Sequence, residues 1–262
     1  MATTVRHSVS LYINSFRHKY KPYYPAIAVG VLGSVIIGRA AWNDYKVFLS
    51  YGPGGVPYNV FGWFVATLIR AFGINMFDVR DFEKSPDQRS WLGRSWPTKN
   101  RSGVRPTIGP HLIPQRQLDQ HAPPEIQEKY QEAFNSLVAQ NANIVQFKLS
   151  KYELHTDAVW VHDDCPVYTL GKDFTREVSH IHKNTDFSTH VILAPKDAMQ
   201  VIRSGWGQLH GLAGVSLFGR KVLPKPYVLL YAPRTEEEVG ILIEIVRAGI
   251  GFMTDSRELM SP

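Results

Sequence analysis

The sequence predicts an α+β fold, with a mainly antiparallel sheet and flanking helices, preceded by an N-terminal membrane helix. Hydrophobic residues make up 44% of the chain and charged residues 20%, which are the proportions of a folded protein. A long apolar segment lies near the N-terminus. After residue 124 the patterns run helix, several strands, helix, strand and helix. This order favours an antiparallel sheet with helices beside it.

The composition limits the classes of function. The 262 residues are enough for one sizeable hydrophobic core. The net charge is +6, but the Lys and Arg residues are scattered, with no zinc-finger spacing, basic-aromatic RNA motif or basic helix. We therefore expect no nucleic-acid partner. The single cysteine, Cys165, excludes an intrachain disulfide.

The N-terminus is expected to be anchored in a membrane. Residues 1–22 form a basic segment, and residues 23–42 are predicted to form a transmembrane or signal-anchor helix, with Arg39 as their one charge and aromatic residues at both ends. The upstream positive charges predict a single pass in the endoplasmic reticulum membrane with a cytosolic N-terminus. The alternative is a buried core helix.

A second apolar segment lies within residues 43–77. Its residues 58–77 have a broad apolar face interrupted by Arg70, and their uncharged part is too short to span a bilayer. We expect an interfacial helix that extends the membrane contact. A core helix or a helix that lines a substrate site is the alternative.

Residues 78–262 are expected to form the soluble domain. A polar, proline-rich wrap leads to residue 124, where apolar residues at helical spacing begin the first helix. A second helix, residues 196–204, is stopped by Gly205. Thr235 begins a capping box for the last helix, which Gly249 is expected to end. The expected strands are residues 143–149, 152–162, 167–170, 188–194 and 227–232.

Three histidines and an aspartate lie within one run of the chain: His180, His182, Asp186 and His190. If the first residues of this run are extended, His180 and His182 project from the same face, because side chains alternate along a strand. A turn around Asp186 then brings His190 back beside them in a hairpin. A helix would instead point the first two histidines in nearly opposite directions.

Three interpretations of this cluster stay open. A metal site would use His180 or His182 with Asp186 and His190, like the two-histidine, one-carboxylate iron sites. A metal-free proton-transfer site would use one histidine as the base and Asp186 to fix its tautomer. In the third interpretation the rings only bond neighbouring polar groups, although each unpaired buried polar group costs about 1–3 kcal/mol.

A glycine-rich run at residues 205–214 contains Trp206, Gln208 and His210. Its glycines allow the backbone to approach a ligand closely, and its side chains offer a ring for stacking and polar groups for orientation. The alternative is a loop with Trp206 buried. Glu153 and His155 lie in a strand-rich stretch, where they either line the same pocket or lie at the surface.

Several motifs follow one another in an order that identifies a family. They are residues 103–106, His111, residues 115–117, 150–155 and 176–182, Asp186, His190, and residues 205–214, 230–238 and 250–254. Together they resemble the motifs of fungal luciferase and its luciferase-like domain relatives. The resemblance covers most of the chain, and the N-terminal hydrophobic anchor fits it too. So many motifs in one order are more specific than any single histidine pair.

The resemblance implies an enzyme that oxidises an aromatic α-pyrone, 3-hydroxyhispidin in the luminous fungi, with molecular oxygen. The oxidised product loses carbon dioxide and, in the luciferases, emits light. No flavin, ATP or added metal is implied, so we expect no cofactor besides O2 as co-substrate. The expected partners are the pyrone, O2 and the membrane.

The resemblance also implies roles for the residues already singled out. The catalytic set is His180, His182, Asp186 and His190, with one histidine as the base and Asp186 as its orienter. The expected substrate-binding residues are Trp206, Gln208, His210, His155 and Glu153. The alternatives are a metal-dependent dioxygenase with two histidines and one carboxylate, and a membrane-bound relative that binds a ligand without catalysis. The chain departs from the luciferase pattern at Thr185, Phe187 and Leu209.

Overall fold

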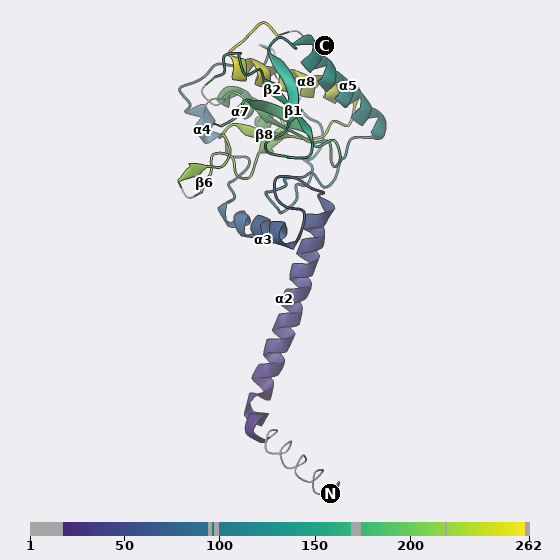
Figure 1. Cartoon of the computed structure of the whole chain (residues 1–262), viewed down its shortest axis with the longest axis vertical. Helices are drawn as coiled ribbons and strands as arrows, with labels where there is room; N and C mark the ends of the chain where they lie inside the picture. Colours follow the sequence, from purple (N-terminus) through teal and green to yellow (C-terminus); the bar gives the residue numbers. More distant parts are fainter. Residues whose placement is uncertain (1–17, 94–95, 97–99, 169–173, 218, 260–262) are drawn as a thin grey trace. The chain divides into compact units, whose positions relative to one another are not determined.

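The computed structural model describes residues 18–93, 96, 100–168, 174–217 and 219–259. The chain divides into two compact units, residues 1–50 and 51–262 (Figure 1). The first unit contains the short 3-10 helix η1 (Lys21–Tyr23) and the long helix α2 (Tyr24–Ser50). Helical structure extends from His18 to Ser50. The most apolar 18 residues of this stretch have a mean hydropathy of 1.6, and none of them is buried. By length and composition this helix is able to cross a membrane, and it extends beyond the predicted residues 23–42.

The second unit holds the remaining described helices and strands. Its helices are α3 (Val60–Ile69), the 3-10 helix η2 (Arg70–Phe72), α4 (Arg80–Glu83), α5 (Pro124–Gln140), α7 (Pro195–Arg203) and α8 (Glu236–Thr254). The unit begins at Tyr51, so residues 51–77 belong to it. This compact unit therefore includes residues that precede residue 78, where the soluble domain is predicted to begin.

A six-stranded sheet forms the centre of this unit. Its strands lie in the order β1 (Val145–Leu149), β2 (Asp157–Val161), β3 (Glu177–Ile181), β4 (Thr189–Ile192), β8 (Tyr227–Leu230) and β5 (Gly207–Leu209). Each neighbouring pair is antiparallel. This confirms the predicted α+β fold with an antiparallel sheet. Strands β6 (Ser216–Leu217) and β7 (Arg220–Lys221) form a separate small hairpin.

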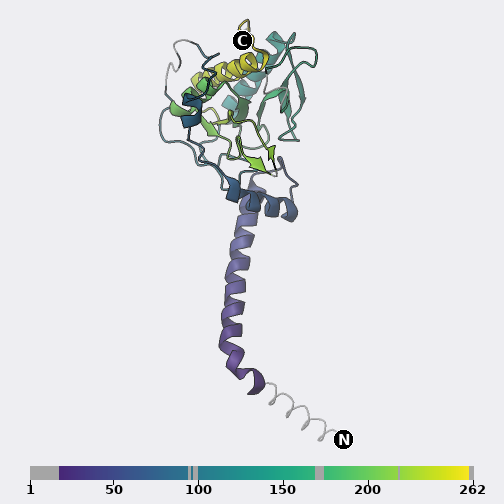
Figure 2. The same cartoon turned by 90° about the vertical axis from the view of Figure 1, so that its left-hand side faces the viewer.

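Helices α8 and α5 pack at one side of the sheet, with α8 against β2, β3 and β4 (Figures 1 and 2). The Thr235 side chain accepts a hydrogen bond from the Glu238 backbone N–H, as the predicted cap requires. Gly249 does not end this helix, which continues to Thr254. A Cβ at Gly249 would lie 2.7 Å from the Val191 side chain. This glycine therefore permits close packing of α8 on β4, and its role as a helix stop was predicted wrongly.

The predicted strand at residues 152–162 is interrupted by a turn that reaches to Thr156. Ser150 holds the turn, because its hydroxyl accepts hydrogen bonds from the backbone N–H groups of Tyr152 (3.2 Å) and Glu153 (2.9 Å). Leu154 adopts a left-handed φ of 68°. The strand predicted at residues 167–170 is not formed at its two described positions. The turn matters for function because it places Glu153 beside the histidines.

Candidate active site

The β3–β4 hairpin brings three histidines together. His180 on β3 pairs directly with His190 on β4, and their ring centroids are 5.3 Å apart. His182 follows the end of β3, with its ring 5.3 Å from that of His180 and 5.0 Å from that of His190. The extended interpretation of residues 180–190, with a hairpin return, is therefore confirmed.

A fourth histidine joins the cluster from the end of β5. The His210 backbone N–H donates to the Tyr227 carbonyl (2.8 Å), and its ring lies 5.2 Å from that of His190. Its Nδ1 accepts a hydrogen bond from the Leu212 backbone N–H at 3.0 Å. In neutral His210 the proton therefore sits on Nε2, so this ring is a hydrogen-bond donor rather than a base.

Glu177 supports His180 from behind. Its carboxylate accepts from His180 Nδ1 (2.7 Å), from the Ser150 hydroxyl (2.8 Å) and from the Lys151 backbone N–H (2.7 Å). A carboxylate only accepts hydrogen bonds, so Nδ1 carries the proton and the Nε2 lone pair of His180 is left available. This is the carboxylate–imidazole arrangement of an oriented base.

Asp186 makes the corresponding contact with His182. His182 Nδ1 lies 2.9 Å from the Ser188 hydroxyl and 3.2 Å from Asp186 Oδ1. The same carboxylate accepts hydrogen bonds from that hydroxyl and from the Gln117 backbone N–H. Asp186 thus contacts His182, whereas Glu177 contacts His180.

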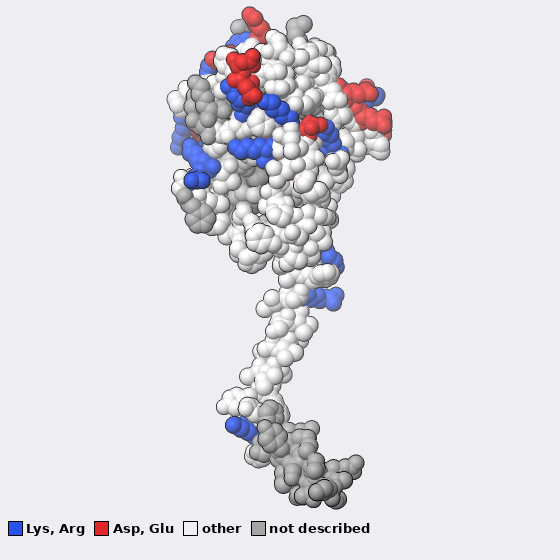
Figure 3. Space-filling view, in the orientation of Figure 1, with Lys and Arg blue, Asp and Glu red and all other residues white. Residues whose placement is uncertain are grey.

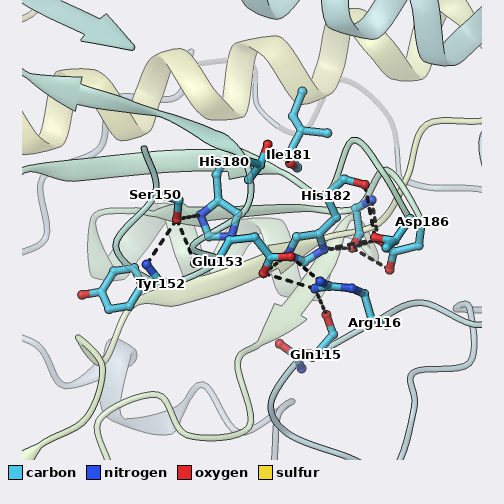
Figure 4. Close-up of polar contacts among 12 residues, drawn as sticks. Gln115, Arg116, Ser150, Tyr152, Glu153, His180, Ile181, His182 and Asp186 are labelled. Carbon is cyan, nitrogen blue, oxygen red and sulfur yellow. Dashed lines mark hydrogen bonds and ion pairs between the residues drawn. The ribbon is translucent and has the colours of Figure 1, made fainter. Parts of the chain in front are cut away.

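A buried ion pair borders the cluster. The Arg116 guanidinium is bonded to the Glu153 carboxylate (Figure 4), and Glu153 Oε2 lies 3.7 Å from His182 Nε2. Burial opposes ionisation of Glu153, but His182 and Arg116 outweigh it and lower the pKa of this carboxyl group. The site is therefore bounded by a fixed negative and a fixed positive charge.

The histidines open into a cavity of about 220 Å³. This volume lies below the roughly 300–1,000 Å³ of most ligand pockets, which limits the ligand to a small molecule such as a planar aromatic. The residues that line it are Gly54, Gly55, Ile113, Pro114, Gln115, Lys151, Tyr152, Glu153, His180, His190, His210, Val222, Leu223 and Tyr227. Tyr227 stacks on His190 at 4.8 Å with an interplanar angle of 11°.

Four buried polar atoms in the cavity wall have no hydrogen-bond partner among the residues that the structure describes: Gln115 Oε1, His180 Nε2, His190 Nδ1 and the Tyr227 hydroxyl. Unsatisfied buried polar groups are costly, so several in one wall indicate that a ligand completes them. His182 Nε2 is also without a partner, although His182 does not line the cavity.

Burial lowers the pKa of three of these imidazoles. It lowers the pKa of His182, lowers that of His190 well below its usual value and lowers that of His210 to about 3. Neighbouring histidines add to the effect on His190 and His210. Burial also raises the pKa of the Tyr227 hydroxyl well above 10. In the cavity wall, His190 and His210 are therefore uncharged and the Tyr227 hydroxyl is protonated at neutral pH.

Not every residue expected at the site reaches the cavity. Trp206 is buried in the hydrophobic core, and the Gln208 amide is held between Met76 and the Tyr231 hydroxyl. His155 is exposed on the turn after Glu153. Trp206 and Gln208 do not line the cavity because the glycine-rich run forms strand β5 at residues 207–209 and pairs with β8, instead of forming an open loop. Of the expected substrate-binding residues, Glu153 and His210 line the cavity.

Sequence reasoning missed Glu177, Ser150, Arg116 and Tyr227. Glu177 lies three positions before His180, a spacing that places side chains on opposite faces of a regular strand. Strand β3 is not regular, because its register with β2 steps from Ser179 to Glu177. This bulge turns Glu177 toward the same side as His180. An acidic residue just before the His-x-His pair was the one signal available in the sequence.

The departures from the luciferase pattern lie away from the cavity wall. Thr185 and Phe187 are in the β3–β4 turn, and Leu209 is a buried residue of β5. None of the three lines the cavity. These substitutions therefore leave the wall of the candidate site unchanged.

Comparisons with known proteins show which family the sequence belongs to. The chain is 32% identical over 223 residues to a luciferase of Armillaria gallica, which covers 81% of each chain. It is 32% identical over 241 residues to a luciferase of Neonothopanus nambi, which covers 88% of each. The luciferase domain family model matches residues 175–249, which include the β3–β4 hairpin. No solved structure matches the chain. The chain thus belongs to the luciferase family represented by these fungal proteins.

Proposed function

We propose that this protein is a membrane-anchored oxygenase that oxidises an aromatic α-pyrone of the 3-hydroxyhispidin type with molecular oxygen. His180 is the base that starts the reaction. One observation carries the proposal: His180 lines the cavity, its Nδ1 is fixed by Glu177, and its Nε2 has no partner. O2 is the only co-substrate that this chemistry requires.

His180 removes the proton of the enolic hydroxyl group. The O–H bond breaks, the proton moves to Nε2, and the electron pair stays on the substrate as an enolate. Glu177 stabilises the imidazolium that forms, because its carboxylate already accepts from Nδ1. His182 and Asp186 form a supporting pair beside this base instead of acting on the substrate directly.

The enolate then reacts with oxygen. A bond forms between the enolate carbon and O2, so the carbon is oxidised and O2 is reduced to a peroxide. The proton on His180 returns to the outer peroxide oxygen. As this oxygen attacks the neighbouring lactone carbonyl carbon, its proton passes through His180 to the ring oxygen, whose bond to that carbon breaks, and a four-membered cyclic peroxide forms. The O–O bond and the bond between the carbonyl carbon and the former enolate carbon then break, which releases carbon dioxide and leaves a carbonyl group on the former enolate carbon. A cavity that excludes water protects the peroxide until this step.

Two donors in the cavity wall suit the oxygen atoms of the substrate. The Tyr227 hydroxyl is buried without a partner, and His210 carries its proton on Nε2. Both groups are neutral donors placed at the wall that holds the base. They are suited to stabilising negative charge as it develops on the enolate and the peroxide.

The direct test is incubation of the purified full chain with 3-hydroxyhispidin in an oxygen electrode fitted with a photon counter. We expect oxygen uptake with release of one carbon dioxide per O2. Light emission together with oxygen uptake would show that the protein is a luciferase, whereas oxygen uptake without light would still support the oxygenase proposal. Substrate binding without uptake would overturn it in favour of a ligand-binding relative.

A metal-dependent dioxygenase is the second candidate. One ligand nitrogen from each of His180, His182 and His190 lies within 4.8 Å of the others. In a tetrahedral site with metal–nitrogen bonds of about 2.0–2.1 Å these atoms would be roughly 3.4 Å apart, so the nitrogen atoms would have to approach one another by up to about 1.4 Å. The carboxylate Asp186 lies behind His182. The expected two-histidine, one-carboxylate set is therefore less favoured than a set of three histidines.

Removal of metal distinguishes the two candidates. For the metal-free base we expect protein dialysed against EDTA to keep its oxygen uptake within about twofold of the untreated value, with less than stoichiometric metal by elemental analysis. The physical reason is that imidazole alone accepts the proton. Loss of uptake that Fe²⁺ restores and Mg²⁺ does not would establish the three-histidine metal centre instead.

A further inference from the structure

A surface helix of a soluble domain usually turns its large apolar side chains toward the core, but helix α3 exposes them. Its small residues Gly62 and Ala66 are buried, whereas large apolar side chains point outward. The exposed row is Phe61 (67% exposed), Phe64 (52%), Leu68 (55%) and, in the following η2, Phe72 (52%). These positions recur at helical spacing, so they form one continuous apolar face, called here the α3 face.

The α3 face is large for an exposed apolar patch. A Phe side chain has a full area of about 150–250 Å², so half-exposure of these four side chains leaves on the order of 400 Å². Patches of about 300–600 Å² on a monomer commonly mark an interaction site. Figure 3 shows a white surface over this part of the second unit, while charged side chains gather farther from α3.

The cavity adjoins the α3 face through the segments at both ends of the helix. Before α3, Gly54 and Gly55 line the cavity. After η2, the Ile74 backbone N–H donates to the Gly211 carbonyl at 3.0 Å, directly beside His210. Of the residues that line the cavity, Gly55 and Lys151 are the exposed ones, so its mouth opens there.

We propose that the α3 face inserts into the surface of a lipid bilayer and that the cavity mouth beside it opens toward the lipid. Chain connectivity favours lipid over other occupants. Residues 51–59 are the whole connection from α2 to α3, and even fully extended they reach about 30 Å. With α2 in a membrane, the α3 face therefore stays close to the bilayer.

Insertion would also serve the chemistry. An apolar aromatic substrate concentrates in lipid rather than in water, so a mouth at the bilayer surface would take it up without an aqueous step. An aromatic row suits the headgroup boundary, where interfacial helices bury their apolar face about 5–10 Å deep. The insertion itself does not depend on the proposed reaction, so the two proposals fail separately.

Nitroxide accessibility tests the insertion. The full chain in a Cys165→Ser background is labelled at Phe64→Cys, reconstituted into phosphatidylcholine nanodiscs and measured by electron paramagnetic resonance. We expect collisions with O2 to dominate over collisions with a water-soluble nickel chelate. A nitroxide label at Phe61→Cys should show the same accessibility pattern, so that the conclusion does not depend on the correct folding of a single variant. The matched control is Glu132→Cys, an exposed position on α5, a helix that lies away from α3 in the same unit (Figure 1).

Each outcome decides the proposal. Nickel accessibility at position 64 equal to that at position 132 would overturn insertion. Spin–spin broadening between labels at position 64, with neither reagent gaining access, would assign the face to a second copy of the chain and would also overturn it. A fivefold or larger excess of O2 over nickel accessibility, relative to the control, supports insertion.

Discussion

Substitution of His180 by alanine is expected to lower the single-turnover rate of oxygen uptake by about 10²–10⁴-fold, the usual contribution of a positioned general base. His180 combines a cavity position, a carboxylate on Nδ1 and a lone pair on Nε2 that no other group uses. No other histidine of the cluster has these three properties together. Single-turnover oxygen uptake at saturating substrate measures the effect on the chemical step.

The matched control is His155→Ala, because His155 is exposed on a turn beside the site and does not line the cavity. This variant should keep the activity of the parent protein. Glu177→Gln should lose activity nearly as far as His180→Ala, because an amide no longer stabilises the imidazolium. A His180→Ala protein with native circular dichroism and activity within tenfold of the parent would assign the base elsewhere.

The sequence contained enough information for the hairpin and the class of fold. Alternation along a strand placed His180 and His182 together, and short strands between a few helices predicted an antiparallel sheet. Both features depend on local patterns. His190 then follows from the turn, because an antiparallel return pairs it with His180.

The supporting residues of the site could not be predicted in the same way. The Glu177–His180 contact depends on a bulge in β3, which strand periodicity does not encode. Arg116 reaches the site from a proline-rich wrap far away in sequence. Trp206 was assigned to the substrate because glycines surround it, yet those glycines serve strand packing: a Cβ at Gly207 would lie 2.4 Å from the Leu229 carbonyl oxygen.

The largest effect on stability is expected at Arg116. Its side chain is only 2% exposed and donates to the carbonyls of Tyr51 (3.2 Å) and Pro53 (3.1 Å), besides its ion pair with Glu153. Substitution by alanine should lower the free energy of unfolding by about 3–5 kcal/mol, because it leaves the Glu153 carboxylate buried without its partner. Urea unfolding of the detergent-solubilised full chain, followed by tryptophan fluorescence, measures this loss.

Two further variants separate the charge from the packing. Arg116→Ala combined with Glu153→Gln should recover part of the loss, because the second substitution removes the uncompensated charge. Arg80→Ala breaks an exposed pair with Asp78 and should leave the urea midpoint unchanged, since water screens that pair. Equal losses in Arg116→Ala and the double variant would contradict the electrostatic explanation. Arg116 would then act through the carbonyls of residues 51–53, the segment that leads to the cavity mouth.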